Sequence, residues 1–261
     1  MAWGATGNAL GAPLSPFATD EVNDLTVFMT AGGDRLAGVT QEAMLNGANA
    51  ALLLRADGAP ELIQFREVEA RASGAFILRG LLRGRRGTDV FVTGHTAGET
   101  FVLLEPETIE RTLLALGDLG LTRHWRAVGA GGLFDEAPVL SRVLTGRDLM
   151  PYAPVHLRAE ILGADILLSW VRRSRLGGAW QDGSGEVILG EAAEAYEVDI
   201  LDGPGGAVQR TLHTNSPFAT YDQSDIAADF GAMPATLSCV VCQISAVIGR
   251  GFSRAATLEI A

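Results

Sequence analysis

Histidine side chains are the first candidates for chemistry, because they bind metals and transfer protons near neutral pH. The chain has four, and they are scattered: His95, His124, His156 and His213. None of them belongs to an H-x-x-x-H or H-E-x-x-H spacing, which places two imidazoles on one helix face. The sequence therefore predicts no metal site.

Two cysteines match the C-x-x-C pattern, Cys239 and Cys242. They have no second ligand pair, and they lie in a strand-like run rather than at a helix start, where a reactive thiolate is stabilised. Alternation along a strand points them to opposite faces, so a disulfide between them is not expected. We interpret both as small core residues of a chain made in a reducing compartment.

Nucleophilic and acid–base catalysis lack their usual patterns. No G-x-S-x-G elbow is present, and Gly183-Ser184-Gly185 is too generic to indicate a nucleophile. A run of acidic residues falls in a polar loop and along one strand's outer face, where a solvated surface is the simpler interpretation. Its members are Glu186, Glu191, Glu194, Glu197 and Asp199. We predict no catalytic residue, no cofactor and no enzymatic activity.

Arginine carries all of the positive charge: the 261 residues include 31 acidic and 20 basic side chains, with no lysine and a net charge of −11. Such an excess of negative charge disfavours nucleic acid as a partner. The arginines cluster at Arg83-Gly84-Arg85-Arg86 and at Arg172-Arg173-Ser174-Arg175. We expect these clusters to pair with nearby carboxylates or to lie at subunit interfaces.

The glycine-rich, strand-like runs that must position these residues predict a mainly β protein. In the first half, Asp57-Gly58 between residues 50–56 and 61–67 predicts a hairpin. Further strands are expected in five stretches, residues 25–30, 75–82, 90–93, 100–105 and 121–128. Residues 107–116 fit a helix and a strand about equally. The proline-rich stretch 149–154 predicts a boundary between residues 1–150 and 151–261.

The second half predicts a two-sheet sandwich of seven strands. These strands are expected at residues 155–162, 166–172, 195–201, 207–213, 218–221, 235–247 and 255–260. Trp170 is the expected core anchor. Tyr196, Val198 and Ile200 should face the core, with Glu197 and Asp199 facing water. A helical turn over 225–230 should be capped by Ser224 or Asp222 and end at Gly231.

Several short words of this sequence resemble one family. In the first half they are LNGANA (45–50), IQFR (63–66), LLRGRRGT (81–88) and FVLL (101–104). In the second half they are SWVRRSR (169–175), GAW (178–180), LGE (189–191), YEV (196–198), ADFG (228–231), QIS (243–245) and GRGF (249–252). In order and spacing the chain resembles the C-terminal portion of the gene transfer agent and siphophage tail-tip protein, also called the megatron or host-specificity baseplate hub protein.

The resemblance implies a structural virion component of the distal tail or baseplate. The second half also resembles a fibronectin type III module, with Trp170 as that module's early-strand tryptophan, so we expect two β-sandwich-like domains. The implied partners are other hub and fibre proteins in a homotrimer, and host contact stays open. No stretch approaches the roughly 18 apolar residues needed to cross a bilayer, so we predict no membrane span. The family's protein is usually several times longer, so functions of its upstream regions are not carried over. The alternative is a cell-surface carbohydrate-binding or adhesin module, which would display Trp3, Trp125 or Trp180 as a sugar-stacking platform.

Overall fold

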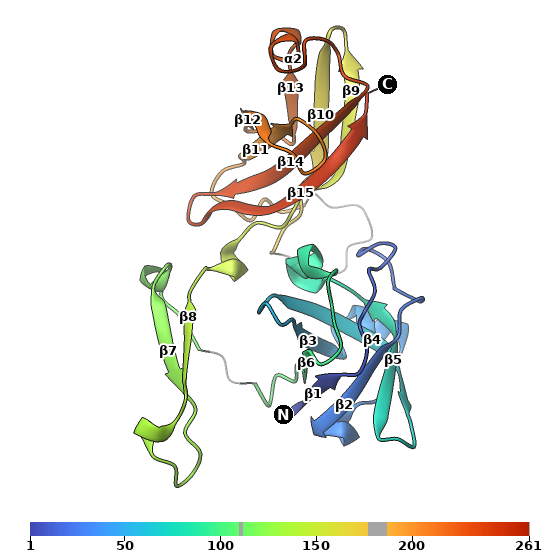
Figure 1. Ribbon diagram of the computed structural model, residues 1–261, viewed down its shortest axis with the longest axis vertical. Helices are drawn as coiled ribbons and strands as arrows, with labels where there is room; N and C mark the ends of the chain where they lie inside the picture. Colours follow the sequence, from blue (N-terminus) through green and yellow to red (C-terminus); the bar gives the residue numbers. More distant parts are fainter. Residues whose placement is uncertain (110–111, 177–186, 261) are drawn as a thin grey trace.

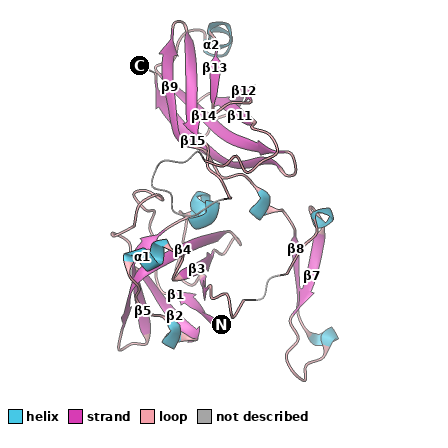
Figure 2. Cartoon of the chain, turned by 180° about the vertical axis from the view of Figure 1, so that it is seen from behind, coloured by secondary structure: helices cyan, strands magenta, loops and turns pink. Residues whose placement is uncertain are grey.

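The computed structural model describes residues 1–109, 112–176 and 187–260. The fold is mainly β, as predicted, and has three parts in chain order (Figure 1). A six-stranded barrel comes first, a two-stranded hairpin follows, and a seven-stranded sandwich completes the chain. The view from behind in Figure 2 shows the hairpin standing apart from the sheets of the other two parts.

The first part is a closed barrel, so the expectation of a sandwich there was wrong. Its strands are β1 (Ala2–Thr6), β2 (Leu25–Ala31), β3 (Ala50–Leu54), β4 (Pro60–Ala70), β5 (Ala75–Leu82) and β6 (Thr100–Leu103), in the order β1-β2-β5-β4-β3-β6. Closure depends on β1, which pairs with β2 on one side and with β6 on the other. Sequence patterns near Trp3 carry no sign of the distant β6 partner.

Inward-facing apolar residues from all six strands fill the barrel. Among them, Leu25, Leu53, Ile63, Phe65 and Phe101 are fully buried. The predicted hairpin around Asp57-Gly58 is confirmed as β3 and β4, which pair from Ala50↔Gln64 to Leu54↔Pro60. The short helix α1 (Gln41–Leu45) precedes this hairpin, and the Thr40 side chain caps it by accepting a hydrogen bond from the Ala43 amide.

The strand expected at residues 90–93 was wrong. Residues Arg85–Phe91 form a kinked 3-10 helical segment between β5 and β6, which we call the bridging segment. Gly84, Arg86 and Gly87 all have positive φ there, and such angles break an extended strand. In the stretch 107–116, residues 107–109 and 112–115 form neither helix nor strand, and residues 110–111 lie outside the described chain.

The hairpin of the middle part consists of β7 (Thr122–Arg126) and β8 (Val139–Val143). The two strands pair antiparallel, with Arg123 opposite Arg142 and Trp125 opposite Leu140. We call residues 116–149 the arm. Neither hydrophobic core includes a residue of the arm.

The last part is a two-sheet sandwich, as predicted. One sheet has the order β13-β10-β9, built from β9 (Val155–Leu162), β10 (Asp165–Val171) and β13 (Phe218–Tyr221). The other has the order β12-β11-β14-β15, built from β11 (Tyr196–Leu201), β12 (Val208–Thr214), β14 (Thr236–Ser245) and β15 (Gly249–Glu259). The predicted boundary between residues 1–150 and 151–261 stays a prediction about independent folding units.

Trp170 is confirmed as a core residue, 5% exposed, and its ring meets Tyr196 edge-on at 5.2 Å between centroids. The helix α2 (Gln223–Phe230) is also confirmed: Asp222 caps it and Gly231 ends it with φ 76°. Asp199 was expected to face water, and that expectation was wrong. Its carboxylate is buried beneath the Arg250 guanidinium and accepts a hydrogen bond from Thr211 at 2.6 Å.

Candidate functional site: a buried charge cluster and the junction it supports

The barrel encloses a cluster of charged side chains around Arg83, the residue that follows β5. The Arg83 guanidinium is fully buried and donates to both carboxylate oxygens of Glu61, at 2.8 and 2.9 Å. It also lies 3.5 Å from Asp20 and donates to the Gly11 carbonyl at 2.9 Å. A buried ion pair of this kind is tolerated only when its remaining hydrogen bonds are satisfied.

His95 and Glu99 complete the buried charge cluster, which thus comprises Asp20, Glu61, Arg83, His95 and Glu99. His95 Nδ1 lies 2.6 Å from Glu99, while Nε2 lies 2.7 Å from Glu61 and 3.1 Å from the Phe91 carbonyl. Both ring nitrogens face acceptors, so the imidazole must be protonated to donate on both sides. Burial opposes that charge, but the hydrogen bonds to Glu61 and Glu99 outweigh it and raise the pKa of His95.

The buried charge cluster holds the bridging segment at both ends. Glu61 accepts the Gly84 amide at 2.8 Å, just before the segment, and Arg83 donates to the Val92 carbonyl at 2.9 Å, just after it. Within the segment, the Thr88 hydroxyl accepts the Leu62 amide of β4 at 2.9 Å. The cluster side chains are at most 3% exposed, so they position backbone rather than meet a substrate.

The outer side of the bridging segment meets the sandwich. Asp89 forms an ion pair with Arg173 at 2.8 Å, and its own side chain is only 6% exposed. The Arg173 guanidinium also lies 5.3 Å from the ring centres of Phe17 and Tyr152, within range of cation–π attraction. Gly87 passes so close to the Tyr152 ring that a Cβ there would lie 2.3 Å from it.

A second set of contacts joins the barrel, the arm and the sandwich. Phe91 of the bridging segment meets Phe252 of β15 edge-on, with ring centres 6.1 Å apart. Arg147 at the base of the arm lies 5.0 Å from the centre of the Phe91 ring. The Phe252 amide donates to the Pro151 carbonyl at 2.9 Å. These contacts and those of Arg173 form one junction between the three parts.

The arginines of the second cluster pair locally, as predicted. Arg172 pairs with Glu194 at 3.0 Å, Arg173 with Asp89 at 2.8 Å, and Arg175 with Glu191 at 3.1 Å. In the first cluster, Arg83 also pairs with carboxylates, but it is enclosed and cannot reach a neighbouring subunit. Sequence reasoning missed the partners His95 and Glu99, although their i, i+4 spacing was visible.

The other candidates from the sequence stay separate. His124 contacts Ser141 in the arm, His156 is exposed on β9, and His213 lies 3.6 Å from Glu197. Cys239 and Cys242 are free and buried, and burial raises the pKa of both thiols to about 11. Within the described ranges, no group of three His, Cys, Asp or Glu side chains is placed to hold a metal ion.

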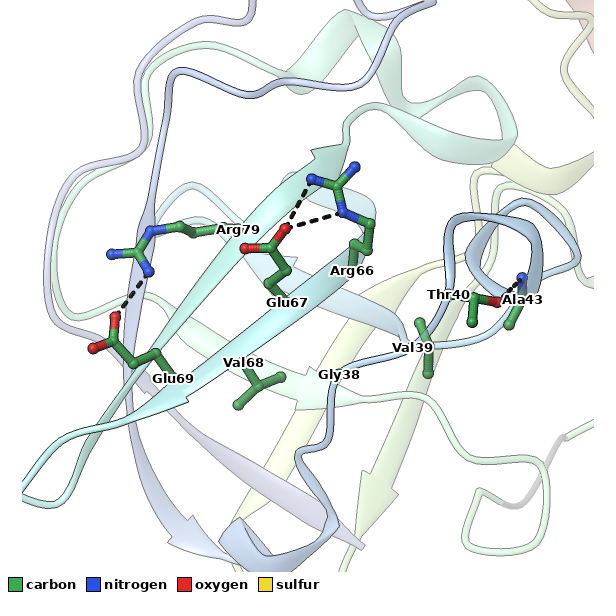
Figure 3. A pocket seen from close by; sticks show the side chains of 9 residues that line it. All are labelled: Gly38, Val39, Thr40, Ala43, Arg66, Glu67, Val68, Glu69 and Arg79. Carbon is green, nitrogen blue, oxygen red and sulfur yellow. Dashed lines mark hydrogen bonds and ion pairs between the residues drawn. The ribbon is translucent and has the colours of Figure 1, made fainter.

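A surface depression on the barrel wall, shown in Figure 3, has a volume of about 680 Å³. Its charged side chains are already paired with one another or with neighbours. Arg66 donates to Glu67 at 2.9 Å and to Glu21 at 3.0 Å, and Arg79 donates to Glu69 at 2.8 Å. The charged side chains that line the depression are therefore engaged in ion pairs.

Comparison with known proteins gives one family match. Residues 1–102, which make up the barrel except its last residue, match the model of a family described as Rcc01698-like, C-terminal. The search of curated proteins gives no match. Among the described helices, none combines the length and apolar character that crossing a bilayer requires.

Two solved structures show a weak overall likeness. The FN1–FN3 domains of chicken CNTN1 share 11% identity at a TM-score of 0.28, over 99% of this chain and 67% of that chain. Titin domains A168-A170 share 12% identity at a TM-score of 0.27, over 99% of this chain and 98% of that chain. The chain is therefore similar to the Rcc01698-like family over residues 1–102. The description of its fold rests on its own strands and their pairing.

Proposed function

We propose that this chain is a structural component of a phage or phage-like tail tip or baseplate, made in the host cytoplasm and built into the distal tail. The observation that carries the proposal is the junction, which joins a barrel and a sandwich into one unit through Asp89, Arg173, Phe91 and Phe252. A subunit that transmits position within a large assembly needs such fixed geometry. The match of residues 1–102 is consistent with a gene transfer agent-related protein.

The sandwich supports the finer part of this proposal, a fibronectin type III-like module. Its seven strands divide into sheets of three and four. Trp170 lies on the second strand of the module and is buried against Tyr196 on the third. Such modules act as rigid spacers that present loops.

The proposed partners are hub and fibre proteins of the tail tip, with this chain present as a homotrimer. In this role the chain is not an enzyme. The buried charge cluster serves the fold, because its side chains are closed to solvent and bind backbone groups on both sides of the bridging segment.

The test loosens the junction without touching either core. Asp89→Ala combined with Arg173→Ala removes the 2.8 Å ion pair, and Arg254→Ala, an exposed arginine on β15, is the matched control. We expect the double variant to fold but to be incorporated into particles at least several-fold less than the control. Normal incorporation of the double variant would contradict a role that depends on fixed domain geometry.

One observation favours the alternative of a carbohydrate-binding or adhesin module. Trp3 and Phe28 are 42% and 48% exposed on the outer wall of the barrel, on the paired strands β1 and β2. Trp125 is half-buried, and Trp180 lies outside the described residues. Glycan binding that Trp3→Ala abolishes, together with absence of the chain from particles, would favour this alternative.

A further inference from the structure

The arm leaves an unusual amount of apolar surface uncovered. Its large apolar side chains are between 43% and 65% exposed: Leu116, Leu121, Val128, Leu133, Phe134, Val139, Leu140 and Val143. An isolated two-stranded hairpin is marginally stable in water, because it has no third strand or helix to cover a face. Exposed apolar side chains gathered on one small element in this way are typical of an interaction site.

The base of the arm is fixed to the rest of the chain. At Gly146 a Cβ would lie 2.6 Å from Leu119 of the arm and 2.8 Å from Ile248, in the turn between β14 and β15. Arg147 contacts the Phe91 ring of the junction. The base is therefore held in place by the sandwich and the barrel, while β7 and β8 extend away from both (Figures 1 and 2).

One face of the hairpin places like charges directly opposite each other. Arg123 and Arg142 are cross-strand partners, with Trp125 and Leu140 as the next pair on the same face. Directly opposed like charges destabilise a strand pair. Asp118 pairs with Arg123, but Arg142 has no carboxylate within ion-pair distance in the part of the chain that the structure describes. The strands β7 and β8 hold three arginines and no acidic residue.

This arrangement specifies the chemistry of what would cover the face. A carboxylate beside Arg142 would offset the repulsion, and apolar groups around it would cover Trp125 and Leu140. Residues 151–261 hold 13 acidic residues against 7 arginines. Many of these carboxylates pair with arginines of the sandwich itself, but in its described part four exposed ones are in no ion pair: Glu160, Asp202, Asp222 and Glu259. The cationic face of one copy is thus complementary in charge to the sandwich of another copy.

We propose that the Arg123–Arg142 face of the arm binds the acidic sandwich of a second copy of this chain. Two such faces would repel each other, so the contact joins unlike surfaces, arm to sandwich. Contacts between unlike surfaces close into rings when the rotation between copies permits it. This contact would be one that holds the proposed homo-oligomer together, and to that extent it rests on the proposed function. Its test uses the purified chain.

The test follows the oligomeric state by analytical ultracentrifugation over a concentration series. Arg142→Glu replaces the opposed arginines with an opposite-charge pair, so the hairpin itself should be no less stable. Arg71→Glu, at a 48% exposed arginine that follows β4 on the barrel, is the control with the same change of charge. We expect the unmodified chain to self-associate, Arg142→Glu to weaken that association at least tenfold, and Leu140→Ser to weaken it as well.

Hydrogen exchange gives a second readout. In the associated form, the amides of β7 and β8 should exchange more slowly than in Arg142→Glu, while barrel amides are unchanged. A chain that stays monomeric at every concentration, or an Arg142→Glu variant that associates like Arg71→Glu, would overturn the inference. A monomeric chain whose Arg142→Glu variant is lost from particles would show that the arm binds a different protein.

The inference and the proposed function fail separately. Self-association through the arm by a chain that is absent from particles would support the arm contact and contradict the tail-tip role. Incorporation into particles that is insensitive to Arg142→Glu, with no self-association, would do the reverse.

Discussion

Removing the charge of Arg83 is the most informative change to the barrel. Arg83→Met keeps most of the side-chain volume but leaves Glu61 and Asp20 buried without their guanidinium partner. Breaking a buried pair on one side costs about 3–5 kcal/mol. The stability of a whole domain is only about 5–15 kcal/mol, so the barrel should become marginal.

Arg66 on β4 provides the matched control. It also pairs with two carboxylates, Glu21 at 3.0 Å and Glu67 at 2.9 Å, but its side chain is 27% exposed and both partners are more than half exposed. Ion pairs in such positions contribute about 0–1 kcal/mol, because water screens them. We therefore expect Arg66→Met to cost at least 2 kcal/mol less than Arg83→Met, by about the difference between these ranges.

Urea unfolding of both variants measures the difference directly. Equal losses of unfolding free energy, or a loss below about 1 kcal/mol for Arg83→Met, would refute the reasoning that the buried charge cluster stabilises the barrel as an ionic unit. If Arg83→Met does not fold, the double variant Glu61→Gln with Arg83→Met should recover soluble protein, because the Gln amide oxygen can still accept the Gly84 amide and leaves no unpaired charge at position 61. Failure of that recovery would also count against the account.

Three further predictions concern the junction, the histidine and a helix cap. Gly87→Ala should destabilise the chain by at least 1 kcal/mol more than Gly131→Ala, roughly the cost of a local clash. Both glycines have φ 81°, but only Gly87 lies against Tyr152. Chemical unfolding of the two variants measures this difference, and equal losses would contradict it. The pKa of His95 is raised, so its stabilisation is complete below about pH 6.5 and declines as pH rises through the folded pKa. The difference in unfolding free energy between the unmodified chain and His95→Gln should therefore shrink as the pH rises. A difference that stays constant up to about pH 9 would contradict a charged imidazole. Asp222→Ala should cost about 1 kcal/mol by removing the cap of α2, measured by thermal unfolding, and no loss would show that the cap is dispensable.

Local sequence signals predicted much of the fold. The Asp57-Gly58 turn located the β3–β4 hairpin, and alternation located Trp170 and Tyr196 in the sandwich core. The capping residue Asp222 located α2. Each of these signals acts over a few residues, so it can be recognised without knowing what packs against it.

Long-range pairing could not be predicted in the same way. Barrel closure depends on β1 pairing with β6, which is about a hundred residues away in the sequence. Asp199 was expected in water because its strand alternates, yet Arg250 from β15 covers it. The arginines of LLRGRRGT were expected to pair with carboxylates or to lie at an interface, but no local signal showed that Arg83 would be fully buried against Glu61 of another strand.

The arrangement of that sequence explains why its arginines differ in role. Arg83 faces the barrel interior, whereas Arg85 lies on the outer side and donates to Gln64 at 3.0 Å. Gly84, which lies between them, has a positive φ of 57°. One short stretch therefore supplies a buried arginine to the charge cluster and an arginine that binds Gln64.

Cryo-electron microscopy of native particles tests the central claim most directly. We expect density at the distal tail into which the barrel and the sandwich fit as one unit, with the junction of Asp89 and Arg173 intact. Particles that assemble fully and transfer their DNA without any density for this chain would contradict it.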